Sequence, residues 1–182
     1  MKTFKLCLSL LAVGVVGTLA GCSTASTKTA DVSDSVRTSL KQAGFRDVSA
    51  TQDRDKGVLT LGGHVATDND KLQAESIARS LAGTQVVANQ IAVIPPGLES
   101  DAKTVNSDLD KGIESNLNAA LIVNNLHENV KYAVKNHVVT LTGEVDSPAK
   151  RARAEEVAGG VPNVQQVVNV LQVKEQKATS SK

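Results

Sequence analysis

Two segments of the chain carry nearly the same residues, VLTLGGHV at 58–65 and VVTLTGEV at 138–145. Each alternates apolar with small or polar residues and is rich in Val, Leu and Thr, which is typical of a β-strand with one buried face. Leu59, Leu61 and Val65 share that face in the first segment. The two segments therefore predict the same strand at two places in the chain.

The similarity continues on the C-terminal side of these strands. A shift of 80 residues places segment 57–93 on segment 137–173 without a gap. A repeat of this length indicates a duplicated domain. The identical pairs are Val58/Val138, Thr60/Thr140, Leu61/Leu141, Gly63/Gly143, Val65/Val145, Ala74/Ala154, Glu75/Glu155, Ala78/Ala158, Gln85/Gln165, Val87/Val167, Asn89/Asn169 and Val93/Val173.

Each copy predicts a helix, two strands joined by a tight turn, a second helix and a third strand. Apolar residues four apart mark the first helix of each copy. They are Val32, Val36 and Leu40 in the first copy, and Val105, Leu109, Ile113, Leu117 and Leu121 in the second. The expected strands are 47–52, 58–65 and 86–94 in the first copy, and 129–134, 138–145 and 167–173 in the second.

The second helix of each copy begins after a residue that favours the N-cap position, Thr67 or Ser147, because its side-chain oxygen accepts a hydrogen bond from the first helical turn. One face of this helix is built from small and apolar residues and is expected to pack on the sheet. The residues of this face are Ala74, Ile77, Ala78 and Leu81, and Ala154, Val157, Ala158 and Val161.

This order of elements predicts an α+β fold, with two tandem αββαβ modules. Each module is expected to be a three-stranded mixed sheet with two helices on one face, since helices this short need a sheet to pack against. The strand–helix–strand connection requires a right-handed crossover. The order of the strands in the sheet stays open.

Four residues that recur in both copies lie in predicted strands although glycine and asparagine are disfavoured there: Gly63, Gly143, Asn89 and Asn169. Glycine weakens a strand, so we expect either a bulge or a close approach of the second helix at Gly63 and Gly143. For Asn89 and Asn169 we expect a side-chain hydrogen bond that holds the preceding loop. A ligand contact is the alternative for the asparagines.

The N-terminus has the pattern of a secretory signal. Lys2 and Lys5 precede an apolar run that ends in Leu-Ala-Gly-Cys at 19–22, which resembles the site where a bacterial lipoprotein is cut and its cysteine acylated. We therefore expect a signal peptide at 1–21, lipidation of Cys22 and a flexible tether at 22–30. Ser23 after the cysteine favours the outer over the inner membrane, with the protein facing the periplasm.

The remaining boundaries follow from composition. The first domain is expected at 31–94 and the second at 104–173, with a linker at 95–103 that opens with Pro95, Pro96 and Gly97. The polar tail at 174–182 is expected to be disordered.

Charge and composition exclude several classes of function. Two of the 20 Lys and Arg lie in the signal peptide, whereas all 19 Asp and Glu follow it, so the processed chain lacks the basic excess of nucleic-acid-binding proteins. His64, His127 and His137 lack metal-ligand spacing and are expected to be exposed. Asp53, Asp55, Glu155 and Glu156 are expected to be solvated charges. No catalytic residue, metal site or cofactor is predicted.

The two repeats, VLTLGGHV with LAGTQVVANQIAV and VVTLTGEV with VAGGVPNVQQVVNVLQV, resemble the BON domain. With the acylation motif, the chain is similar to outer-membrane lipoproteins that carry two such domains and support envelope integrity, and to periplasmic osmotic-stress proteins without the anchor. The resemblance implies a non-enzymatic role, with phospholipid binding proposed for some members.

Lipid binding in this family would place basic and aromatic residues on the first helix of the second module. That helix instead carries Asp108, Asp110 and Glu114 against Lys111. The expected contact with anionic lipid is the cluster Lys150, Arg151 and Arg153, loosely matched by Lys71 and Arg79, although an ordinary solvated helix face explains it too. Peptidoglycan or another envelope protein is an alternative partner, and a chaperone-like stress protein that binds unfolded chains is the alternative function.

Overall fold

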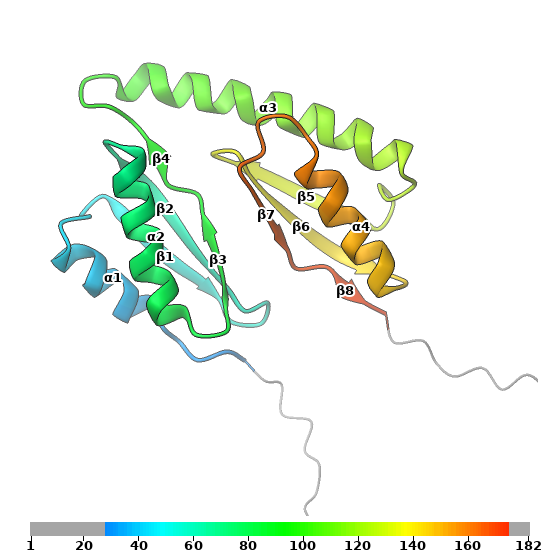
Figure 1. Cartoon of the computed structure of the whole chain (residues 1–182), viewed down its shortest axis with the longest axis horizontal. Helices are drawn as coiled ribbons and strands as arrows, with labels where there is room; N and C mark the ends of the chain where they lie inside the picture. Colours follow the sequence, from blue (N-terminus) through cyan, green and yellow to red (C-terminus); the bar gives the residue numbers. More distant parts are fainter. Residues whose placement is uncertain (1–27, 175–182) are drawn as a thin grey trace, which may run out of the picture.

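The computed structural model describes residues 28–174, which form two modules in succession (Figure 1). In each module two helices lie on one face of a small mixed sheet. The α+β fold with two tandem αββαβ modules, predicted from the repeat, is confirmed. The signal peptide predicted at 1–21 and Cys22 lie outside the described residues.

The two modules contain equivalent helices and strands. The first module has α1 (Ser33–Gln42), β1 (Val48–Asp53), β2 (Val58–Val65), α2 (Asp68–Ala82), β3 (Val86–Asn89) and β4 (Ala92–Val93). The second module has α3 (Glu99–Val123), β5 (Val130–Lys135), β6 (Val138–Val145), α4 (Pro148–Gly159), β7 (Gln166–Asn169) and β8 (Gln172–Val173).

The strand at the centre of each sheet is the one from which the repeat was recognised. β2 pairs antiparallel with β1 and parallel with β3 and β4, and β6 pairs in the same way with β5, β7 and β8. The strand order, which the sequence left open, is β1-β2-β3 and β5-β6-β7. The register is also repeated, because Leu61 lies opposite Asn89 and Leu141 lies opposite Asn169.

The third strand of each module is broken, so the continuous strands predicted at 86–94 and 167–173 were wrong. β3 pairs with β2 as far as Leu61, and β4 resumes the pairing at His64, beyond Gly63. Gly63 takes a positive φ of 94° and bends β2. The neighbouring strand must bend with it, and the two residues between β3 and β4 absorb the change.

Each module has its own apolar core between helices and sheet. Leu40, Leu59 and Leu61 are fully buried in the first, and Leu117 and Leu141 in the second. The second helices meet the sheets through alanines, which have 0% exposure at positions 74, 78, 154 and 158. Small side chains let these helices lie close to the sheet, so neither core needs an aromatic centre.

Three residues predicted for the cores are exposed. Val105 and Leu109 have exposed fractions of 57% and 37% because α3 begins well before the sheet of the second module, and it turns a buried face to that sheet only from Ile113 onward. Leu81 is 37% exposed, and Ala82 takes the buried place at the end of α2.

The structure also changes two segment boundaries. α3 begins at Glu99, five residues before the domain start predicted at 104, so half of the predicted linker 95–103 is helical. Residues 28–30 of the predicted flexible tether are bound to the first module through hydrogen bonds to Arg54 and Gln52. Residues 175–182 of the predicted tail lie outside the described residues.

Gly63 and Gly143 are constrained by the residue that directly precedes the first strand of each sheet, and the second helix, one of the two predicted causes, is not involved. Gly63 has a φ of 94° and Gly143 a φ of 118°, which non-glycine residues rarely adopt. A Cβ at Gly63 would overlap the Asp47 carbonyl oxygen, and one at Gly143 would overlap that of Asn129. Glycine is therefore required both by backbone conformation and by space.

We expect Gly63→Ala to destabilise the protein by about 2–4 kcal/mol, because the new methyl group meets backbone that cannot move away. Urea unfolding of the chain without residues 1–22 measures this change. Gly112→Ala is the control, since a Cβ there meets open space on α3 and should raise stability by about 0.5–1 kcal/mol. Equal effects of the two substitutions would show that Gly63 is not a constraint.

Candidate functional site

The predicted basic cluster lies on the exposed first turns of α4, where Ser147 caps the helix by accepting a hydrogen bond from Lys150 N. Lys150 Nζ lies 2.6 Å from Asp146 Oδ2, and this hydrogen bond lowers the pKa of the Asp146 carboxyl. Arg153 binds Glu156 Oε2 at 2.8 Å and Asn124 Oδ1 at 3.0 Å. The structure therefore brings the cluster together, but with carboxylates among the cations.

Asn89 and Asn169 join the third strand to the second helix of their modules. Asn89 Nδ2 donates to Glu75 Oε2 at 2.7 Å, and its Oδ1 accepts from Ile91 N at 3.3 Å. Asn169 repeats both contacts with Glu155 and Leu171. The partner is thus the second helix and the strand break, instead of the preceding loop that the sequence analysis predicted. Glu155, expected to be a solvated charge, is a partner of Asn169.

The two modules meet through equivalent apolar residues. Val58 and Ala88 of the first module pack with Val138 and Val168 of the second, and none of the four is more than 6% exposed. Val58 and Val138 correspond in the repeat, as do Ala88 and Val168. These side chains point to the sheet face opposite the helices, because residues alternate along a strand. The junction therefore resembles the interface of a two-fold dimer.

Gln166 closes the open edge of β3. Its Nε2 donates to Val87 O at 2.7 Å, and its Oε1 accepts from Asn89 N at 2.9 Å. These two backbone groups lie on the side of β3 that faces away from β2, where a further strand would bind. One side-chain amide thus takes the place of a neighbouring strand's peptide group and covers an exposed sheet edge.

A second set of polar contacts lies at the other end of the junction. Asp110 of α3 accepts hydrogen bonds from the backbone N–H of Asn136 and of His137, at 2.8 and 2.9 Å. Asn136 Nδ2 then donates to Gln90 O of the first module at 2.7 Å. The β5–β6 turn is therefore held by α3 and is attached to the first module.

The predicted histidines do not form a site. His64 and His127 are exposed as expected. His137 was expected to be exposed, but it is half-buried at the junction, and its Nε2 is a buried atom without a hydrogen-bond partner in the described chain. Within residues 28–174, no three His, Cys, Asp or Glu side chains are grouped so that they could hold a metal ion.

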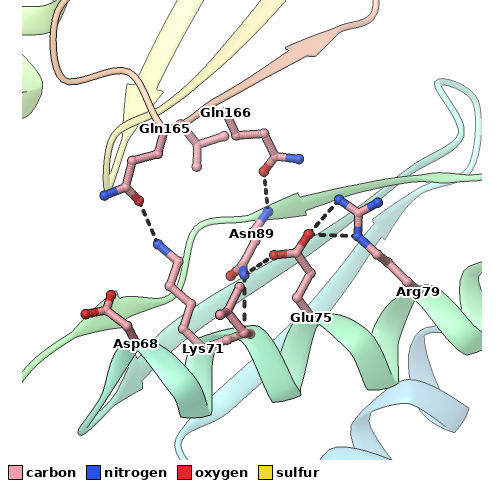
Figure 2. Close-up of a pocket in the computed structure, with 9 residues that line it drawn as sticks. Asp68, Lys71, Glu75, Arg79, Asn89, Gln165 and Gln166 are labelled. Atoms are coloured by element: carbon pink, nitrogen blue, oxygen red, sulfur yellow. Dashed lines mark hydrogen bonds and ion pairs between the residues drawn. The ribbon is translucent and has the colours of Figure 1, made fainter.

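A cavity of about 370 Å³ lies between the modules, and Figure 2 shows its polar lining. Lys71 Nζ donates to Gln165 Oε1 at 3.1 Å across the junction, and Arg79 Nε donates to Glu75 Oε1 at 2.7 Å. Burial lowers the pKa of the Lys71 ammonium, while nearby Asp68 and Glu75 oppose this shift.

The lining of this cavity carries as many carboxylates as cations. Asp68 and Glu75 balance Lys71 and Arg79. Lys71, Arg79, Glu75, Asn89 and both glutamines already have protein partners. Its chemistry therefore suits a joint between modules better than a binding pocket for a charged ligand.

Sequence reasoning missed Gln165, Gln166, Asp110 and Asn136. Gln165 was visible as an identical partner of Gln85 in the repeat. Gln166 left a different signal, because its counterpart in the first copy is Val86, which is 43% exposed. A polar residue in only one of two equivalent strands indicates a contact that the copies do not share.

Comparisons with known proteins agree on one family. The BON domain family model matches residues 28–95 and 109–175. The osmotically-inducible protein Y of Escherichia coli (strain K12) is 30% identical over 122 residues, which cover 66% of this chain and 59% of that protein. The match therefore spans less than two thirds of this relative.

Solved structures add only a weak similarity. The C-terminal domain of CdsD, the structural protein of the Type III secretion system of Chlamydia trachomatis, aligns with a TM-score of 0.34 and 15% identity, over 80% of this chain and 98% of that chain. A second CdsD structure gives 0.35 and 14%, over 76% and 90%.

We expect Gln166→Ala to loosen the junction, because it leaves Val87 O and Asn89 N buried without a partner, at a cost of about 1–3 kcal/mol. Amide hydrogen exchange should become faster at Asn89, and urea unfolding should show the loss of stability. The control is Gln172→Ala in β8, an exposed residue whose side chain has no hydrogen-bond partner among the described residues. Unchanged exchange at Asn89 would contradict the role assigned to Gln166.

Proposed function

This chain belongs to the BON-domain family, and from that premise we propose that it is a non-enzymatic lipoprotein that supports the bacterial cell envelope under stress. Two BON domains occupy most of the chain, and a relative is named for its induction by osmotic stress. Under this proposal the protein faces the periplasm and is held to the outer membrane by an acyl anchor on Cys22.

The observation that carries the non-enzymatic role is how the modules use their interiors. Within residues 28–174, Asn89 is the one buried polar residue, and it binds the second helix and the strand break. The other buried side chains are apolar, and all of them except Ala92 and Ile94 pack in the two cores or at the junction. Both modules thus use their interiors for packing, which suits a binding or structural role.

The membrane anchor rests on the sequence. The motif at 19–22 provides a cysteine after small residues, at the end of a short apolar run. In the part of the chain that the structure describes, no helix is long and apolar enough to cross a bilayer. The lipid on the Cys22 sulfur would be a diacylglycerol, and two acyl chains are enough for stable anchoring. The modules add a further contact with the leaflet.

For that contact we propose anionic phospholipid at Lys150, Arg151 and Arg153. All three are exposed. Lys150 pairs with Asp146 and Arg153 with Glu156, and these surface pairs contribute about 0–1 kcal/mol each. Arg151 donates instead to Asn169 O. A lipid phosphate can therefore replace a carboxylate at little cost. α3 does not suit this role, since it carries five carboxylates against two lysines. An envelope protein or peptidoglycan is the alternative partner.

The chaperone-like alternative needs exposed apolar surface. α3 supplies some, since Val105 is 57% and Leu109 37% exposed. The junction, where an open apolar groove would have favoured this function, instead has a cavity whose charged and amide side chains already bind one another, beside apolar residues that are already buried. Lipid binding therefore remains the first proposal.

Cys22→Ala should abolish membrane attachment, because no other residue in the motif can carry the thioether-linked lipid. Fractionation of cells should find the wild-type chain with the membranes, and the variant as a soluble or unprocessed protein. A processed variant that still sediments with membranes after a high-salt wash, which removes the contact of the basic cluster with anionic lipid, would rule out the acyl anchor.

Reversal of the cluster with Lys150→Glu, Arg151→Glu and Arg153→Glu should abolish binding to anionic vesicles. The chain without residues 1–22 is mixed with vesicles with and without phosphatidylglycerol, and binding should need the anionic lipid and weaken with added NaCl. Glutamate is favourable near a helix N-terminus, so the reversal should not unfold α4. Lys103→Glu with Lys111→Glu on α3 is the matched control and should bind as the wild type does.

A further inference from the structure

The segment before α1 is bound to the first module through its backbone and side chains. Thr29 N donates to Arg54 O at 3.1 Å, and Arg54 Nε donates to Thr29 O at 2.8 Å, so the two residues hold each other reciprocally. Lys28 Nζ lies 3.3 Å from Asp55 Oδ1. These contacts attach residues 28 and 29 to the β1–β2 hairpin.

Two glutamines extend this attachment. Gln52 Nε2 donates to Ala30 O at 2.7 Å, and Gln85 Nε2 donates to the same oxygen at 3.1 Å. Gln52 Nε2 also lies 2.6 Å from Gln85 Oε1, while Gln52 Oε1 accepts from Val32 N at 2.9 Å. We name the hairpin 54–57 and the loop 83–85 the seat end of the first module, because the N-terminal segment is seated between them.

Among residues 28–174 this arrangement occurs once. Gln165, the counterpart of Gln85, accepts its hydrogen bond from Lys71 of the first module. Gln52 has no counterpart, since β5 has Val134 at the place opposite Val139 that Gln52 has opposite Leu59. The second module therefore uses this corner for the junction, and only the first module holds the N-terminal segment.

The seat limits how far the fold can lie from the membrane. Six peptide steps separate Cys22 from Lys28, and six steps span at most about 22 Å. If Cys22 is acylated, as the proposed function holds, the seat end must lie within about that distance of the lipid headgroups.

The arrangement of the modules adds a second feature on the same side. In Figure 1 the N-terminal segment leaves the first module at the lower side of the view. α4 starts after the arrowhead of β6, also towards the lower side, whereas α3 runs along the upper side. The start of α4 and the seat end therefore lie towards one side of this view and the acidic α3 towards the other, while the Arg153 side chain reaches Asn124 at the end of α3.

We propose that one face of this protein lies on the lipid surface, with the seat end and the start of α4 towards the anchoring leaflet and α3 away from it. The inference rests on the proposed acylation of Cys22. Charge separates the two surfaces: at the seat end Lys28, Arg54 and Lys56 balance Asp31, Asp53 and Asp55, whereas α3 has an excess of carboxylates. A leaflet with anionic lipid therefore repels α3 but not the seat end.

The test is fluorescence quenching of the acylated protein in vesicles that contain nitroxide-labelled headgroups and phosphatidylglycerol. Single-cysteine variants Lys56→Cys, Ala149→Cys and Asp108→Cys place a dye at the seat end, the start of α4 and α3, all at exposed positions. The mature chain offers no other free thiol, since Cys7 is removed and Cys22 is acylated. We expect strong quenching at 56 and 149, and at 108 no more than for a soluble dye.

A variant with ten Gly and Ser residues inserted between Ser23 and Lys28 separates the seat from the anchor. It should keep its membrane attachment but lose quenching at position 56, because the longer segment no longer holds the seat end at the surface. Equal quenching at 56 and 108 in the wild type, with the protein bound to vesicles, would overturn the orientation and leave the anchor intact. A chain recovered without acyl groups would overturn both proposals.

Discussion

The bend in the central strand of each module is the constraint on which the other contacts depend. Gly63 and Gly143 adopt positive φ angles against the carbonyl groups of Asp47 and Asn129, so the central strand cannot run straight. The third strand pairs on both sides of this bend and breaks where it occurs. Asn89 and Asn169 stand at the break, where an amide can bind both the chain two residues on and a glutamate of the second helix. In each module, the positive φ of one glycine thus determines the bend of the sheet, the place where the third strand breaks and the position of the second helix.

The junction between the modules is formed by equivalent strands of the two copies, although the sequences of the copies have diverged. The apolar contact pairs equivalent positions of both modules, as two identical subunits would. The polar contacts are not shared: Gln166 binds the edge of β3, whereas Val86 at the equivalent position cannot bind the edge of β7 in return. Gln85 and Gln165 are identical, yet one holds the N-terminal segment and the other Lys71. The two copies therefore share the same apolar core, whereas equivalent polar positions at the edge of the junction have different partners.

The sequence predicted what depends on local pattern and failed where a contact comes from a distant segment. The repeat and the alternation of apolar residues placed β2 and β6 with their correct ends, and Thr67 and Ser147 as caps. Val105 and Leu109 continue the apolar spacing of α3 but have no sheet beneath them, which only the three-dimensional arrangement shows. The junction could not be predicted either, since a surface glutamine such as Gln166 has no periodic pattern that marks its partner.

A rigid junction changes what a weak lipid contact can achieve. The cations of α4 are mixed with Asp146 and Glu156, so their attraction to a free vesicle is small. Under the proposed acylation of Cys22, the lipid anchor and the bound N-terminal segment hold the first module at the leaflet, and the proposed contact of α4 with lipid becomes an intramolecular event with a high effective concentration. That gain requires the modules to keep their relative orientation, and this is the contribution of Gln166 and of Asn136 with its bond to Gln90. In this arrangement, residues that touch no lipid determine whether the basic cluster can reach it.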